Sequence, residues 1–149
     1  MSNPSFSFYP ANVKITKPLG IVTIDQFIEA NRNPKDPVKE LFKKIQVAGE
    51  KEKQELKQQL FYFTPCVNTN GLGRSYSDIT SFSGLLCLEF DKIPDFAVHL
   101  RDWIFDNFEE CVCAYISPSG KGVKTLWKIP VVDNVDSFKE YFYGLSYKF

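Results

Sequence analysis

Two acidic side chains end the most clearly predicted strand of the sequence, and their spacing allows them to share a cation. The run GLLCLEFD ends in Glu89 and Asp91. Side chains two positions apart on a strand point to the same face and lie about 7 Å apart. Such carboxylates can hold Mg²⁺ or Mn²⁺, hard cations that take oxygen ligands and keep places for water and phosphate. The same pair is also typical of the solvated face of a half-exposed strand, so both interpretations stay open.

A segment with the composition of a phosphate-binding turn lies further along the chain. SPSGKG, residues 117–122, joins two predicted strands, CVCAYIS and VKTLWKIP. Backbone N–H groups, hydroxyls and lysines in such a turn can surround phosphate oxygens. An ordinary hairpin turn also favours Gly, Ser and Pro. The candidate phosphate ligands here are Ser117, Ser119, Gly120, Lys121, Gly122 and Lys124.

The elements that must position these residues form an α+β pattern. Helices are predicted from Thr23, where Gln26 completes a capping box, from Asp36 and after Gly49. From Gly84 onward the order is strand, helix, strand, strand and helix. This order predicts a ferredoxin-like or RRM-like βαββαβ fold, with an antiparallel sheet that lacks its final strand.

The same pattern predicts one domain over residues 1–149, with a helical N-terminal layer over 1–60 and a sheet core over 61–149. The residues before Gly84 contribute one further strand, around the aromatic run FYFTPCVN. The missing last strand would follow Phe149. We therefore expect this chain to be the N-terminal part of a longer protein, truncated before that strand.

In a ferredoxin-like sheet the third strand runs antiparallel beside the first, so Lys124 should face the two carboxylates. Alternation places Lys124 and Lys128 on the uncovered face that also carries Glu89 and Asp91. Arg74, in a glycine-rich segment, is a further cation that could reach a nucleic acid. Lys128 and Arg74 are the candidate nucleic-acid contacts.

Composition limits the class of protein. The 18 basic and 18 acidic residues balance, which excludes a protein that coats nucleic acid by bulk charge, so a polyanion site must be local. The four cysteines have no CxxC spacing, and we expect reduced thiols, with Cys111 and Cys113 on one face of a strand. The N-terminus lacks a secretory pattern and no apolar run approaches the ~18 residues of a membrane span, so we expect a cytoplasmic protein.

Three segments together carry a resemblance to a known family. ELKQQLFYFTPCVNTNG, SFSGLLCLEFD and SPSGKGVK, in this order, resemble the VirE N-terminal-domain family. This family is a primase-polymerase-like branch of the archaeo-eukaryotic primase superfamily, found in phages and bacterial mobile elements, often ahead of helicase-like modules. The resemblance runs from about Val38 to the end of the chain.

The resemblance implies a metal-dependent nucleotidyltransferase of the DNA primase or polymerase type. Glu89 and Asp91 fall on its catalytic metal ligands, Mg²⁺ or Mn²⁺ is the implied cofactor, and the turn with Lys124 falls on its nucleotide-phosphate motif. A nucleoside triphosphate, a single-stranded DNA template and a helicase-like module are the implied partners, and a bacterial or phage-infected cell is the implied setting. The departures are Glu89 where Asp is usual, Lys124 where many primases carry His, and the lack of a third acidic motif. The alternative is a non-catalytic DNA-binding and recruitment module that keeps the fold.

Overall fold

Three strands of apolar and β-branched residues form the central sheet, because such residues fit a pleated surface that is buried on both faces. The strands pair antiparallel in the order β6-β8-β7, so β8 lies in the middle. Their bounds are Leu85–Phe90 for β6, Cys111–Ile116 for β7 and Val123–Lys128 for β8.

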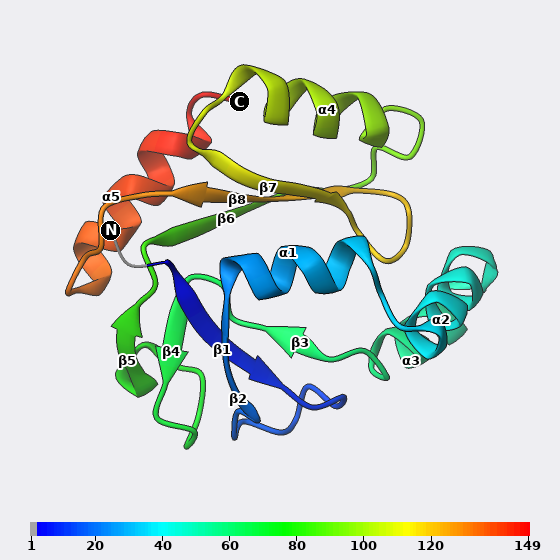
Figure 1. Ribbon diagram of the computed structural model, residues 1–149, viewed down its shortest axis with the longest axis horizontal. Helices are drawn as coiled ribbons and strands as arrows, with labels where there is room; N and C mark the ends of the chain where they lie inside the picture. The colour runs from blue at the N-terminus through cyan, green and yellow to red at the C-terminus, as the bar shows by residue number, and fades with distance from the viewer. Residues whose placement is uncertain (1–2) are drawn as a thin grey trace.

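The computed structural model describes residues 3–149. Within this range the protein is an α+β fold with three small antiparallel sheets and five α-helices (Figure 1), and no helix there is long and apolar enough to cross a bilayer. The second sheet has the order β2-β1-β3, and β4 pairs with β5. The bounds are Ser5–Tyr9 for β1, Gly20–Thr23 for β2, Tyr62–Phe63 for β3, Val67–Thr69 for β4, Ile79–Phe82 for β5, Ile24–Arg32 for α1, Asp36–Val47 for α2, Glu50–Lys57 for α3, Ala97–Asn107 for α4 and Val135–Ser146 for α5.

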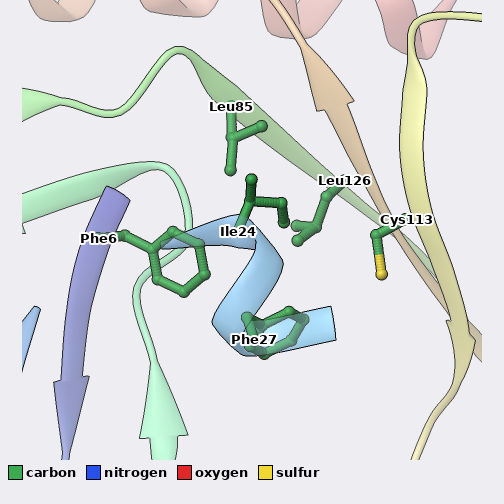
Figure 2. Packing of buried hydrophobic residues seen from close by; sticks show 6 residues of the cluster. All are labelled: Phe6, Ile24, Phe27, Leu85, Cys113 and Leu126. Carbon is green, nitrogen blue, oxygen red and sulfur yellow. The ribbon is translucent and has the colours of Figure 1, made fainter. Parts of the chain in front are cut away.

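Helices cover both faces of the central sheet (Figure 1). On one face, α4 packs over β7 and β8 and α5 packs against β6. The core on this face is Leu86, Leu88, Ile104, Cys111 and Trp127. On the other face lie α1 and β1, and Figure 2 shows the core between them and the sheet, which consists of Phe6, Ile24, Phe27, Leu85, Cys113 and Leu126. The face predicted to be uncovered is therefore closed over most of its area.

Helix starts follow the local sequence signals. The predicted capping box of α1 is confirmed, because Thr23 Oγ1 accepts from the Gln26 N–H and Gln26 Oε1 accepts from the Thr23 N–H. Asp36 is the first residue of α2 rather than its cap, which is Lys35. The prediction for this second helix was thus correct in place and wrong by one residue in its cap.

The N-terminal sixty residues contain strands as well as the predicted helices. β1 and β2 pair from Ser5 opposite Thr23 to Phe8 opposite Gly20, so the expected helical layer holds only for α1, α2 and α3. The signal for β1 is the alternation in SFSFY, a period of two that is typical of a strand. The run FYFTPCVN, predicted to form one strand, forms two short strands, β3 and β4, on either side of Pro65 and in two different sheets.

A β-bulge in β7 overturns the prediction that Cys111 and Cys113 share a face. Cys111 lies opposite Trp127 while Cys113 lies opposite the next residue along β8, Leu126, so Val112 is an extra residue in the strand. Cys111 therefore packs on the α4 side and Cys113 on the α1 side. All four cysteines are free thiols.

Candidate functional site

The predicted carboxylate and the predicted lysine meet across the central sheet. Glu89 on β6 lies directly opposite Lys124 on β8. Lys124 Nζ lies 2.5 Å from Glu89 Oε1, and the two side chains are 31% and 48% exposed. An ion pair this close to solvent is stabilised only weakly, because water and salt screen it. Either partner can therefore be drawn to another charge at low cost.

Asp91 reaches the turn itself. A Cβ at Gly122 would lie 2.9 Å from Asp91 Oδ1 and 2.6 Å from the carbonyl oxygen of Phe90, so only glycine fits between the turn and the end of β6. The Ile93 N–H also donates to the Lys121 carbonyl at 2.9 Å. These contacts bring residues some thirty positions apart to one place. We call the group formed by Glu89, Asp91, Lys124 and the turn 117–122 the turn corner.

The turn is a hairpin connection whose own hydrogen bonds leave donors available. Ser117 donates its N–H to the Gly122 carbonyl, and Gly120, with φ of +74°, donates to the Ser117 carbonyl. The Ser117 and Ser119 hydroxyl oxygens lie 3.1 Å apart. Within residues 3–149, the N–H groups of Ser119 and Lys121 donate to no protein acceptor. Such free N–H groups next to hydroxyls are the donors that an anion requires.

Helix α3 contributes a neighbour that the sequence analysis missed. Glu50, the first residue of α3, lies 3.2 Å from Lys121 Nζ and 3.5 Å from Lys53 Nζ. The side-chain hydrogen bond from Lys121 lowers the pKa of the Glu50 carboxyl. Lys53 is buried, with only 4% of its surface exposed. The only available signal was the charged run EKEKQELK, which is typical of a solvated helix face and does not indicate a tertiary partner.

The donor set limits how a metal could bind. Among residues 3–149, no cluster of three or more His, Cys, Asp and Glu side chains is placed to hold an ion. Glu89 and Asp91 remain as two oxygen donors, and Lys124 already neutralises one of them. Mg²⁺ commonly binds through one or two carboxylates together with substrate phosphates and water. The turn corner therefore fits a metal that arrives with a polyphosphate better than a free ion.

The two predicted nucleic-acid contacts lie away from this corner. Lys128 lies opposite Leu85, at the far end of β8 from Lys124, and borders a cleft beside α5. Arg74 stacks 4.9 Å above the ring of Tyr62 and donates to the Val13 carbonyl in the β1–β3 part of the molecule. The expected cluster of Lys124, Lys128 and Arg74 beside the carboxylates is therefore not formed.

One comparison with known proteins identifies a family. Residues 55–148 match the family model described as BT4734-like, N-terminal domain. The chain belongs to this family. The matched part of this BT4734-like domain contains the whole turn corner. Glu50 and Lys53, its neighbours on α3, precede the matched residues. No curated protein and no solved structure matches the chain.

Proposed function

We propose that this domain binds a nucleoside triphosphate with Mg²⁺ or Mn²⁺ at the turn corner and takes part in primase-polymerase-type nucleotidyl transfer on single-stranded DNA. The setting would be the replication of a phage or mobile element, beside a helicase-like module. The proposal includes a ferredoxin-like core, which the strand order β6-β8-β7, helix α4 between β6 and β7, and helix α5 after β8 support. The observation that carries the proposal is the meeting of Glu89, Asp91 and Lys124 with the turn.

The phosphate half of the site is supplied by the turn. Its free N–H groups and the Ser117 and Ser119 hydroxyls can donate to phosphate oxygens, while Lys121 and Lys124 neutralise charge. Both lysines already hold carboxylates, which resemble phosphate in charge and in accepting hydrogen bonds. A triphosphate would displace Glu50 from Lys121 and Glu89 from Lys124.

The metal half follows from that displacement. Once Lys124 turns to phosphate, Glu89 is released and can join Asp91 on a cation that also contacts the phosphates. Phosphoryl transfer needs mostly positioning and charge neutralisation, which such a metal supplies. The protein's own residues would hold the nucleotide and orient it, and the release of Glu89 would couple nucleotide binding to metal binding.

A second candidate function is a non-catalytic DNA-binding module that recruits a helicase. The specific observation in its favour is the Glu89–Lys124 ion pair, which leaves Asp91 as the less occupied carboxylate. The lack of a cluster of three or more metal-ligating side chains within residues 3–149 also favours it. In this case nucleic acid would bind without nucleotide uptake.

Calorimetric titration of MgATP and MgdATP into the domain tests the proposal. We expect binding in the native chain and clear weakening in Asp91→Asn and in Lys124→Ala. Asp136→Asn and Lys14→Ala change exposed residues outside the corner and serve as matched controls that should bind as the native chain does. Equal affinity in all five proteins would refute the site. Tight binding of single-stranded DNA with no nucleotide binding would select the recruitment module.

A further inference from the structure

A cleft of about 530 Å³ runs along strand β7 on the side away from β8. Its floor is the continuous stretch from Val112 to Pro118, and no residue of β6 or β8 lines it. One wall is formed by α1 and α2, and the other by α4 (Figure 1). The cleft therefore follows the free edge of the central sheet.

The backbone of β7 presents unused hydrogen-bonding groups to this cleft. In an antiparallel pair, bonded and non-bonded residue pairs alternate. Because the Ser117 N–H donates to Gly122, the next bonded positions are Tyr115 and Cys113. Ala114 and Ile116 lie between them, so their N–H and C=O groups point outward. Neither residue takes part in any other hydrogen bond among residues 3–149.

This edge lacks the usual protection against strand pairing. Exposed edges commonly carry lysine, proline or inward charges, whereas CVCAYI has none of these. The opposite edge, on β6, is treated differently. There the Leu85 N–H donates to Ser83 Oγ, and the Cys66 thiol bonds to the backbone of Cys87. The β7 edge is shielded only by the two walls of the cleft.

The walls indicate the side chains that such a chain would carry. Ile28, Phe42 and Phe105 supply apolar surface. Arg101 is neutralised by Asp102 at 2.7 Å. Within residues 3–149, the side chains of Arg32 on the α1 wall and Asp106 on the α4 wall make no ion pair or hydrogen bond. A carboxylate on the incoming chain would pair with Arg32.

We propose that β7 binds an extended polypeptide segment as an added strand, with small apolar side chains in the cleft and an acidic side chain at Arg32. Main-chain hydrogen bonds to Ala114 and Ile116 would provide affinity, and the walls would provide specificity. This inference does not depend on the proposed nucleotide site. The occupant is an extended segment of a partner protein.

Amide hydrogen exchange measured by NMR tests the proposal with a defined probe. The probe is an acetylated, amidated six-residue peptide that alternates valine with threonine and carries one central glutamate. At about ten times its Kd, bound peptide should slow exchange at Ala114 and Ile116 about tenfold. Exchange at Cys113 and Tyr115, already bonded to β8, should change little. The same peptide methylated on alternate backbone nitrogens is the matched control and should not protect these amides.

Charge reversal provides the second arm. Arg32→Glu should weaken binding of the glutamate peptide about two- to fivefold. It should strengthen binding of a second peptide in which lysine replaces the central glutamate. Arg101→Glu, on the opposite wall, serves as the comparison variant and should have less effect. Unchanged exchange at Ala114 and Ile116 with millimolar peptide, or equal protection by the methylated peptide, would overturn the proposal. Protection by an oligothymidylate instead of the peptide would assign the cleft to nucleic acid and would also overturn it.

Discussion

Lys124 and Glu89 lie directly opposite each other on β8 and β6, and their side chains form an ion pair beside the β7–β8 turn. The pair joins the predicted phosphate ligand to the predicted metal ligand. It keeps the turn corner electrically neutral at this point without a bound molecule. A polyanion and a cation that bind together could replace this ion pair by two new ones, Lys124 with the polyanion and Glu89 with the cation. The pair is therefore the natural target for mutation.

Glu89→Gln should separate phosphate binding from metal binding. Because the amide no longer holds Lys124, we expect metal-free ATP to bind about two- to fivefold more tightly. The additional affinity given by Mg²⁺ should be lost, which calorimetry with and without EDTA can measure. Glu40→Gln frees Lys43 from a comparable exposed pair on α2 and is the control. A preserved magnesium effect in Glu89→Gln would contradict the assignment of this carboxylate.

Gly122→Ala should destabilise the protein and disturb the corner. The new Cβ would lie 2.6 Å from the Phe90 carbonyl oxygen, so the turn must move away from β6. We expect a loss of about 1–3 kcal/mol in the free energy of unfolding, measured by urea denaturation. Gly144→Ala in α5 has open space around its Cβ and should be neutral or stabilising by about 0.5–1 kcal/mol. A Gly122→Ala protein as stable as the native chain would show that the turn is not pressed against β6.

Glu50→Gln should increase polyphosphate binding at the turn. The Glu50 carboxylate now competes for Lys121, and this contact lowers the pKa of Glu50. A lowered pKa means that the pair is intact above the ordinary carboxyl range and is lost as the pH falls through the folded-state pKa. Tripolyphosphate titration should therefore show tighter binding in the variant near neutral pH, and less difference from the native chain in acid.

Glu52→Gln is the matched control for this variant, because Glu52 is an exposed residue of the same helical turn that makes no ion pair within residues 3–149. Equal tripolyphosphate affinity in Glu50→Gln and Glu52→Gln would indicate that Glu50 does not compete at the turn.

The half-buried thiols of Cys66 and Cys87 should make stability fall in alkaline solution. Burial raises the pKa of Cys66 to about 11 and that of Cys87 to about 12, from the ordinary thiol value of 9.0. The folded protein thus binds these protons more tightly than the unfolded chain. Their contribution to stability is complete below the unfolded pKa and is lost as the pH rises toward the folded values.

Urea denaturation across this alkaline range measures the effect, and Cys66→Ala should reduce its slope. Tyr115, whose pKa burial also raises, contributes in the same direction, so the comparison between native chain and variant isolates the thiol. Identical slopes would contradict the prediction.

Much of the corner could be predicted from the sequence because its parts lie on strands with regular alternation. The antiparallel pairing of the first and third strands places Lys124 opposite Glu89. This pairing follows from the order of the strands, and the facing of the two side chains follows from the alternation of residues along each strand. The grouping of Arg74 and Lys128 with them failed. Lys128 lies on the same strand but at its other end, and Arg74 is held by Tyr62 and Val13 through contacts that no local pattern reveals.

The coverage of the sheet could not be predicted for a related reason. Whether a strand face is solvated depends on what packs against it, and the α1 side of β6 carries Cys87 and Glu89 among apolar residues. Phe6 and Phe27 close this face from segments more than fifty residues away. Glu50 was missed in the same way, because its contact with Lys121 joins positions 71 residues apart.

The bulge in β7 fixes the length of chain that this strand must have. With Val112 present, Cys111 turns toward Trp127 while the residues after it keep the opposite phase. Removing that one residue would restore simple alternation, and the side chains that precede the bulge would then point to the opposite face of the sheet. Sequences that share this architecture should therefore vary in length at the loops between elements and keep the number of residues within β7 constant.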